Sequence, residues 1–540
     1  MADNLIMRFY RQKPFIILCS VFLLQWAFLF NSHQGTWDGG FYYAYARSIT
    51  FDFDLDLVND LTLSYPTSSP DFVAKSFETH LTKTGRVETP FAIGTGLFWA
   101  PWLGILHLVN QIAILFGGGW EQPTGYEWLF VGGTAIFSAI TALLAIGLAY
   151  KVSEEIAGKK TALASAITLM FTTSLIHYQF RQPFYSHAAS AFTTALCIYI
   201  WRQHQRHQNQ RLTITHAAIL GSAIGFAALV RWQHITYAIL PVFSVIFWWK
   251  ESDDNNQNKW RQAFTFLCTA GLAALAFLSV QLAFWRLFFG NWLTVPQGSA
   301  FLNWTAPFVL QVLFSTYHGL FTWSPVALVA ILGLVLTLRK QPRLVIPLLC
   351  IFILETYVNG STVDWFGGGG YGPRRYISET AIFVIGYAAF LNALPQKARR
   401  YVTISLGALL FLHQWILLRY GISEKIGGKL LSMSPTFKWV DQPVSIFLQT
   451  IVGYLPTMLS NTVDVFVFPS SPLFLYLQND GLPWPNIITL LLTAVFIFSC
   501  YTINHIWNTR RPPSAPEFSL LIPTTILVII AFNLWILNWA

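Results

Sequence analysis

The chain has 540 residues, of which 54% are hydrophobic and only 11% are charged. A soluble protein of this length would carry roughly a quarter charged residues, so the composition excludes an ordinary soluble domain and predicts an all-α polytopic membrane protein. The formal net charge of +9 does not indicate nucleic-acid binding, because the Lys and Arg residues are spread over short loops between apolar segments.

The first apolar segment covers residues 14–30 and follows Arg8, Arg11 and Lys13, which predicts a cytoplasmic N-terminus. Together with the later apolar segments, it predicts about thirteen transmembrane helices. The later segments are 127–150, 161–177, 187–203, 215–230, 234–249, 263–288, 320–338, 343–358, 377–394, 401–419, 485–503 and 519–538.

The stretch 91–116 is apolar and long enough to cross, but the charges that follow it argue against a net crossing. A single crossing there would place the loop around Lys159, and every basic loop after it, outside the membrane. Gly94, Gly96, Pro101 and Gly104 also interrupt the stretch. We therefore expect short interfacial or re-entrant helices beneath the first outer loop.

This topology leaves several loops on the outer side. They are 31–126, 178–186, 289–319, 359–376 and the longer 420–484. We expect a first module over 1–395 and a C-terminal group of helices over 396–540 that includes the last of these loops. The unusual polar residues of the chain gather in the outer loops.

Asp38 opens the first outer loop, in the sequence TWDGGFYYAYARSI. Tyr42, Tyr45 and Ile49 follow it at helical spacing, which predicts a helix lying at the membrane interface. A carboxylate held among aromatic groups tends to have a raised pKa and suits a general base. The alternative is that Asp38 caps the N-terminus of this helix.

The sequence FDFDLD alternates apolar residues with Asp52, Asp54 and Asp56. The alternation predicts a short strand-like segment with its carboxylates on one face, or a divalent-metal site made of oxygen ligands. The alternative is that these aspartates are structural or solvated. The sequence indicates no other cofactor.

Four basic residues of the outer loops are candidates for binding a phosphate group, namely Lys75, Arg231, Arg374 and Arg375. Arg231 falls at an outer turn between two short apolar segments, where a guanidinium needs an anionic partner. Arg374 and Arg375 follow four consecutive glycines in DWFGGGGYGPRRY and lie against the positive-inside trend. Pairing with Asp364 or Glu379 would also explain them.

Further residues of the outer loops could contact a substrate. His187 and Arg181 lie in the short loop FRQPFYSH, and His318 lies before an apolar segment in STYHGLFTWSP. For each, a structural role at the interface is the alternative. The candidates for substrate binding are Tyr42, Arg181, His187, His318 and Tyr371.

The order of these features resembles the GT-C superfamily of membrane glycosyltransferases, in its family 39-like group of protein O-mannosyltransferases and aminoarabinose transferases. The resemblance covers residues 1–395 and rests on three features: an acidic residue soon after the first span, the proline-containing segment ETPFAIGTGLFWAPW, and the basic turn EEIAGKK. The family often has a second acidic residue after the third span, where this chain has Ser186 and His187.

The resemblance implies a GT-C fold and an inverting transfer of sugar from a polyprenyl-phosphate donor to a hydroxyl group of a glycan, lipid or protein acceptor. Asp38 would be the base, and the active site would face outward from a bacterial inner membrane. Two other functions stay open, a transporter or flippase of a lipid-linked sugar and a non-catalytic scaffold. A transporter usually shows repeats and polar groups at mid-membrane, and neither is evident here.

Overall fold

The computed structural model describes most of the first 420 residues. The described residues are 2–32, 38–64, 81–206, 212–252, 256–315 and 317–420, together with the single residues Val452, Phe468 and Ser471. Lys75, almost all of the loop 420–484 and the predicted spans 485–503 and 519–538 lie outside the described residues.

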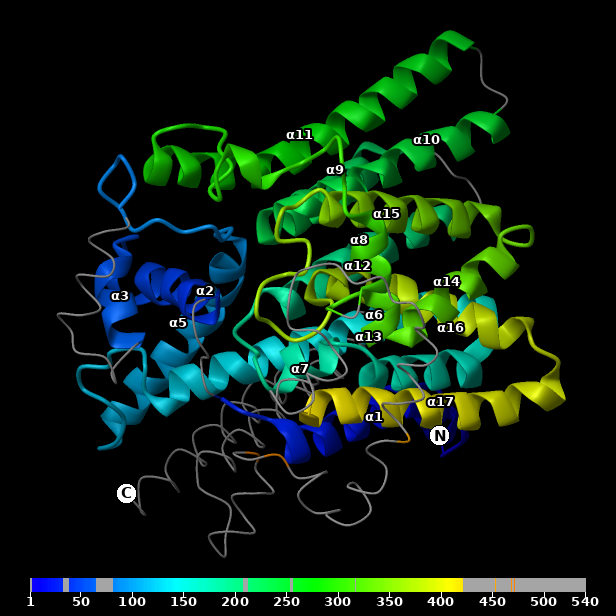
Figure 1. Cartoon of the computed structure of the whole chain (residues 1–540), viewed down its shortest axis with the longest axis horizontal. Helices are drawn as coiled ribbons and strands as arrows, with labels where there is room; N and C mark the ends of the chain where they lie inside the picture. The colour runs from blue at the N-terminus through cyan, green and yellow to red at the C-terminus, as the bar shows by residue number, and fades with distance from the viewer. Residues whose placement is uncertain are drawn as a thin grey trace, which may run out of the picture.

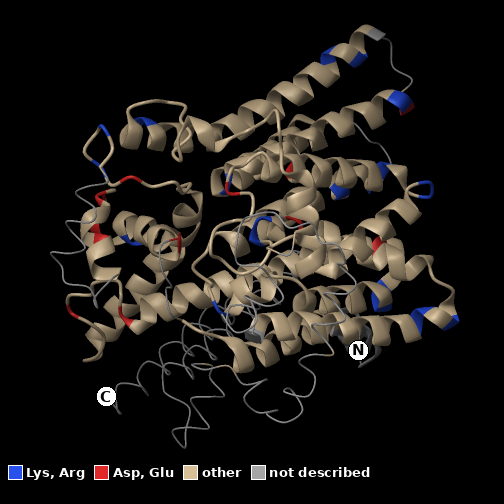
Figure 2. Ribbon diagram, in the orientation of Figure 1, with Lys and Arg blue, Asp and Glu red and all other residues tan. Residues whose placement is uncertain are grey.

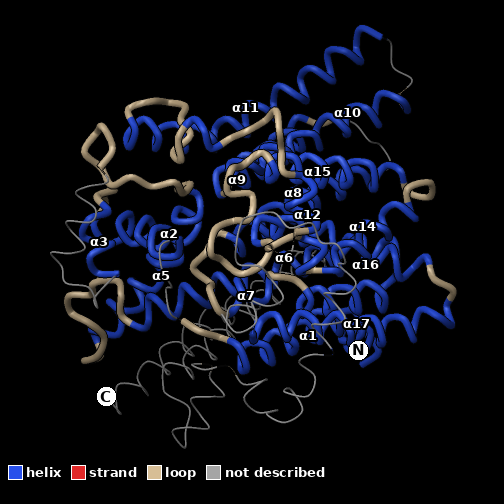
Figure 3. Tube along the Cα trace, viewed as in Figure 1, coloured by secondary structure: helices blue, strands red, loops and turns tan. Residues whose placement is uncertain are grey.

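Within these ranges every regular element is a helix (Figure 3). The long apolar helices are α1 (Ala2–Leu29), α6 (Trp128–Thr172), α8 (His187–Arg206), α9 (Ile214–Val230), α10 (Ile239–Glu251), α11 (Asn256–Phe289), α14 (Pro325–Thr337), α15 (Pro342–Gly360), α16 (Thr380–Ala393) and α17 (Gln396–Tyr420). Short helices join them: α7 (Leu175–Phe180), η2 (Trp232–Ala238), η3 (Ser299–Phe301), α12 (Val309–Phe314), α13 (Leu320–Trp323) and η4 (Arg374–Glu379).

These helices match the apolar segments predicted for the first 420 residues and confirm an all-helical membrane protein. Six of the described helices are long and apolar enough to cross a bilayer. Figure 2 shows a group of Lys and Arg residues at the end of the helices where the N-terminus lies. The basic loops among the described residues therefore lie toward one end of the molecule, which agrees with the positive-inside pattern.

Helix α6 contains two of the predicted spans. Its backbone leaves helical geometry at Gly158, where φ is 75° and ψ is 162°. Glycine adopts this conformation without the strain that a Cβ atom would cause. After Gly158 the chain runs back along the first half of α6. Near the end of this return, Gln179 donates a hydrogen bond of 3.0 Å to the carbonyl oxygen of Ala139 in that first half.

The first outer loop forms helices α2 (Asp38–Arg47), η1 (Ser48–Asp52), α3 (Leu57–Ser64) and α5 (Gly94–Leu115). In Figure 1, α2, α3 and α5 lie together at the left, away from the N-terminus. The expectation that 91–116 is broken into short pieces is wrong, because α5 is one continuous helix of 22 residues with Pro101 inside it. The absence of a net crossing stays a prediction.

The glycines of α5 serve close packing instead of breaking the helix. A Cβ atom at Gly94 would lie 2.2 Å from the carbonyl oxygen of Leu229, and one at Gly96 would lie 2.4 Å from Cβ of Tyr45. Both distances are far below van der Waals contact, so only glycine lets α5 approach α9 and α2 this closely. This packing fixes α2, which begins with Asp38.

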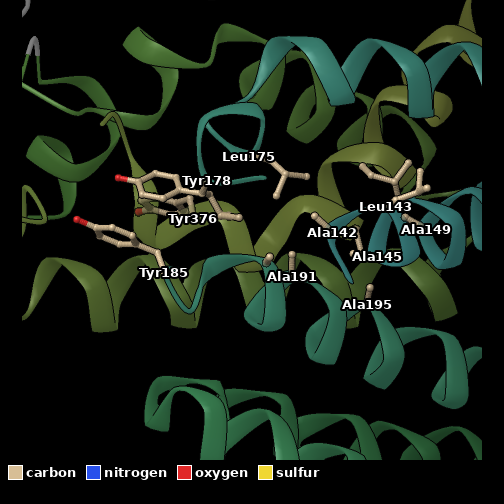
Figure 4. Packing of buried hydrophobic residues seen from close by; sticks show 14 of the residues in the cluster. Ala142, Leu143, Ala145, Ala149, Leu175, Tyr178, Tyr185, Ala191, Ala195 and Tyr376 are labelled. Atoms are coloured by element: carbon tan, nitrogen blue, oxygen red, sulfur yellow. The ribbon is translucent and has the colours of Figure 1, made fainter. Parts of the chain in front are cut away.

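Small residues also join the helices that follow. On α9, Gly221 and Gly225 face the backbone of Ala270 and Ala274 on α11. This is the small-xxx-small pattern that lets membrane helices pack at short distance. Figure 4 shows buried alanines of α6 and α8 in one row, with Tyr178, Tyr185 and Tyr376 grouped at one end of it.

We expect Gly96→Ala to destabilise the protein by about 1–3 kcal/mol, because the new methyl group must displace Tyr45 and with it α2. The matched control is Gly147→Ala in α6, where a Cβ atom meets nothing within 4 Å. That control should be neutral or stabilising by up to about 1 kcal/mol. Thermal unfolding of both variants in detergent measures the difference, and equal stability of the two would contradict the packing argument.

Candidate functional site

A cavity of about 280 Å³ lies where the first outer loop meets the ends of several helices. Its walls come from α2, the segment before α5, the start of α8, the junction of α9 and η2, the end of α15, and η4. Asp38, Arg231, Arg374 and Arg375 are among the lining residues. Residues from distant parts of the sequence thus line one cavity.

Asp38 and Arg374 form an ion pair across this cavity. Nη1 of Arg374 donates to Oδ2 of Asp38 at 2.5 Å, although the two residues are 336 positions apart. Their side chains keep only 16% and 21% of their surface exposed, Arg374 and Asp38 respectively. Asp38 is also the first residue of α2, so the positive end of the helix dipole stabilises its carboxylate as well.

Tyr42 lies one helical turn after Asp38 and lines the same cavity. Residues four positions apart share one face of a helix, which explains why both point inward. Burial raises the pKa of the Tyr42 hydroxyl. The phenol is therefore neutral at physiological pH and can donate a hydrogen bond to a bound molecule.

Arg375 is held by the loop that precedes it. Its Nη2 donates to Oδ1 of Asp364 at 2.6 Å, and its Nη1 donates to the hydroxyl of Thr362. The pairing with Asp364 that the sequence left open is therefore present for Arg375. Arg374 instead pairs with Asp38, so the two neighbouring arginines turn to different carboxylates.

The four glycines before these arginines shape the loop around Arg374. Gly367 and Gly368 have φ of 76° and 67°, a region that residues with a Cβ atom rarely adopt. A Cβ atom at Gly370 would lie 2.8 Å from the hydroxyl oxygen of Tyr178 and 3.0 Å from Cδ of Arg374. The close approach that the glycines permit is thus to the side chain of Arg374.

Arg231 differs from the other two arginines in its partners. Its Nη1 lies 3.0 Å from Nδ1 of His187, and its Nη2 donates to Oε1 of Gln233 at 3.3 Å. Because a guanidinium only donates, Nδ1 of His187 must accept, and the imidazole is neutral with its proton on Nε2. Among the described residues no carboxylate lies within 4.0 Å of Arg231.

The structure brings six of the predicted residues into this one cavity: Asp38, Tyr42, His187, Arg231, Arg374 and Arg375. Three others lie elsewhere. Arg181 donates to the carbonyl oxygen of Leu29 at 3.1 Å, Nδ1 of His318 lies 2.8 Å from the carbonyl oxygen of Phe366, and the Tyr371 hydroxyl accepts from Gln414 at 2.8 Å. Substrate binding by these three has no support from their positions.

Several residues of the cavity were not singled out from the sequence. Gln233, Gln297, Asn359 and Thr362 add amide and hydroxyl groups to the lining. Gln233 is only two residues from Arg231, which is a signal that could have found it. Gln297 and Asn359 lie in apolar or irregular surroundings that give no local signal.

The strand-like reading of FDFDLD is wrong. Residues 48–52 form the π-helix η1, and Phe53 follows in the left-handed region with φ of 58°. The carboxylate of Asp54 accepts from the hydroxyl of Ser48 at 2.8 Å, and that of Asp56 accepts from the backbone N–H of Val58 at 3.2 Å. The tight turn between η1 and α3 uses these side chains as local acceptors.

Asp52 accepts hydrogen bonds from Arg47 and from Asn59. In the described part of the chain no group of three or more His, Cys, Asp or Glu residues is arranged to hold a metal ion. The contacts of Asp52, Asp54 and Asp56 account for them as structural residues. A divalent metal at these aspartates stays a prediction.

Asp60 forms the buried centre of this loop. Oδ1 of Asp60 accepts from Nη1 of Arg47 at 3.0 Å, while Nε of Arg47 donates to the carbonyl oxygen of Thr124 at 2.7 Å. Burial raises the pKa of the Asp60 carboxyl to about 7, although Arg47 acts to lower it. The pair joins α2 and α3 to the segment that precedes α6.

We expect the titration of Asp60 to lower the free energy of unfolding as pH rises from about 4 to about 7. The ordinary pKa of the carboxyl is 3.8, so between these values the folded state binds more protons than the unfolded state, and deprotonation opposes folding. Asp60→Asn, which cannot titrate, should lose this part of the pH dependence. The measurement is thermal unfolding of both proteins across this range, and parallel curves would show that Asp60 does not titrate there.

No protein-family model matches the sequence, and a search of curated proteins finds no match. Among solved structures, the crystal structure of ArnT from Cupriavidus metallidurans bound to undecaprenyl phosphate is similar to this chain, with a TM-score of 0.46 and 12% sequence identity. The alignment covers 92% of this chain and 77% of that chain.

Proposed function

We propose that this chain is a membrane glycosyltransferase of the GT-C type that moves a sugar from a polyprenyl-phosphate donor to an acceptor hydroxyl. One observation carries the proposal: a carboxylate, Asp38, shares a cavity of about 280 Å³ with three arginines, Arg231, Arg374 and Arg375. Transfer from a phosphate-linked sugar needs this pair of functions, a base for the acceptor and positive charge for the leaving phosphate.

The reaction is an inverting displacement at the anomeric carbon. The acceptor oxygen forms a bond to that carbon while its proton passes to the carboxylate of Asp38. The bond between the anomeric carbon and the phosphate oxygen breaks, and its electron pair leaves with the lipid phosphate. A positioned general base contributes roughly 10²–10⁴-fold to such a step.

The charge of the cavity suits an anionic donor. Asp38 and Asp364 each pair with one arginine, at 2.5 Å and 2.6 Å, whereas Arg231 contacts only neutral side chains. The lining side chains therefore include one more positive than negative charge, which favours a phosphodiester. Arg374 also orients Asp38, so that the base and the phosphate-binding group are held together.

The remaining roles complete the proposal. Tyr42 and His187 contact the sugar or the acceptor, since both line the cavity. Residues 1–395 form the catalytic module, with the N-terminus in the cytoplasm of a bacterial cell and the cavity on the outer side of the inner membrane. The acceptor is a glycan, a lipid or a protein.

We expect Asp38→Asn to reduce transfer by roughly 10²–10⁴-fold, because asparagine cannot accept the proton. The matched control is Glu121→Gln, which removes an exposed carboxylate from the same outer loop and should leave the rate unchanged. Both proteins are reconstituted in lipid with radiolabelled polyprenyl-phosphate sugars, and transfer to added acceptors is counted.

The same vesicles test the transporter alternative. If label crosses the bilayer without being transferred, and Asp38→Asn does not alter its passage, the enzyme proposal is refuted. Near-normal transfer by purified Asp38→Asn would refute the role of Asp38 as base. Adding a chelator to the wild-type assay tests the divalent metal at Asp52, Asp54 and Asp56.

A further inference from the structure

Glu355 is a fully buried acidic residue near the outer end of α15, and the proposed reaction does not use it. It does not line the cavity, but its neighbours do. An acidic side chain at this depth is costly unless several donors converge on it. The identity of those donors indicates what the residue does.

Three donors of the η2 segment surround the carboxyl group of Glu355. Nε2 of Gln233 donates to it at 3.0 Å and the hydroxyl of Thr236 at 2.5 Å. Nδ1 of His234 lies 3.4 Å from its Oε1, while Nε2 of His234 lies 2.5 Å from the hydroxyl oxygen of Ser190 on α8. Glu355 therefore holds the segment that follows Arg231 against α15.

The bond from Gln233 has a direction that matters for the cavity. A carboxylate only accepts hydrogen bonds, so the amide of Gln233 must present its NH₂ group to Glu355. Its carbonyl oxygen is then turned the opposite way, toward Arg231, and it accepts from Nη2 at 3.3 Å. With the amide reversed, two N–H donors would face the guanidinium and repel it.

We propose that Glu355 is a positioning residue: through the amide of Gln233 it fixes the guanidinium of Arg231 in the cavity, where that guanidinium binds the donor phosphate. The binding of the donor phosphate by Arg231 rests on the proposed function, whereas the positioning of Arg231 does not. Arg231 is the arginine of the cavity that contacts no carboxylate, so a chain of two hydrogen bonds replaces the direct ion pair that holds Arg374 and Arg375.

The test compares two buried glutamates. Glu355→Gln replaces one of the two acceptor oxygens by an NH₂ group and removes the negative charge that strengthens the bond from the Gln233 amide. Glu379→Gln alters an equally buried carboxyl group on η4, which accepts instead from the hydroxyl of Ser378 at 3.3 Å. We expect Glu355→Gln to weaken binding of decaprenyl monophosphate, measured by calorimetry in detergent, by about tenfold or more, the effect of losing one hydrogen bond to a charged group. Glu379→Gln should bind within about twofold of the wild type.

A second variant separates positioning from general damage to the fold. Gln233→Leu breaks the chain of bonds but leaves Thr236 and His234 to satisfy Glu355. If Glu355 acts through Gln233, adding Glu355→Gln to Gln233→Leu weakens binding no further. Independent losses that add together would refute the proposal, as would unchanged binding by Glu355→Gln.

A structure of the Glu355→Gln variant gives a readout that does not depend on the proposed function. We expect the contact between Arg231 and Gln233 to be lost and the guanidinium to be displaced. An unmoved Arg231 would refute the proposal. If the wild-type protein binds no decaprenyl monophosphate, the phosphate donor is wrong, and this structure still decides whether Glu355 positions Arg231.

Discussion

The ion pair between Asp38 and Arg374 is the contact on which the cavity depends. It joins the first helix of the outer loop to a loop more than three hundred residues later, at 2.5 Å. Opposite charges in a largely buried setting attract strongly, and each charge would be costly there without the other. The pair therefore fixes how the first outer loop lies over the helix ends. It also places a carboxylate and a guanidinium where a phosphate-linked sugar would need both.

Close backbone packing keeps these charges in place. Gly94 and Gly96 bring α5 against α9 and α2, and Gly370 makes room for the side chain of Arg374. Each of these glycines lies where a methyl group would overlap a neighbouring atom. The site is thus held by contacts that leave little freedom, which is what preorganised electrostatic catalysis requires. The buried bonds among Glu355, Gln233 and Arg231 extend the same principle to the remaining arginine.

Asp38 and the three aspartates of FDFDLD lie in the same outer loop, but their surroundings differ. Asp38 faces a cavity lined by arginines, whereas Asp52, Asp54 and Asp56 accept hydrogen bonds from residues close to them in the same loop. Alternation of apolar and acidic residues predicted a strand there, but local side-chain acceptors favoured a π-helix and a tight turn. A few hydrogen bonds from side chains decide between a strand and a turn, and the periodicity of the sequence does not reveal them.

Hydropathy and charge alone determined the all-helical membrane class and the positions of most apolar helices in the first 420 residues, because a bilayer imposes its thickness and charge asymmetry directly on the sequence. They also gave the aspartates of the first outer loop and the outer arginines as candidates, since charged groups near a membrane are rare, and the family resemblance singled out Asp38. Only the tertiary structure decided which charges meet. Arg374 pairs with Asp38, Arg375 pairs with Asp364, and Arg231 contacts neutral side chains. Arg181, His318 and Tyr371 lie outside the cavity. Such choices depend on distances between segments far apart in the chain, and no local pattern records them.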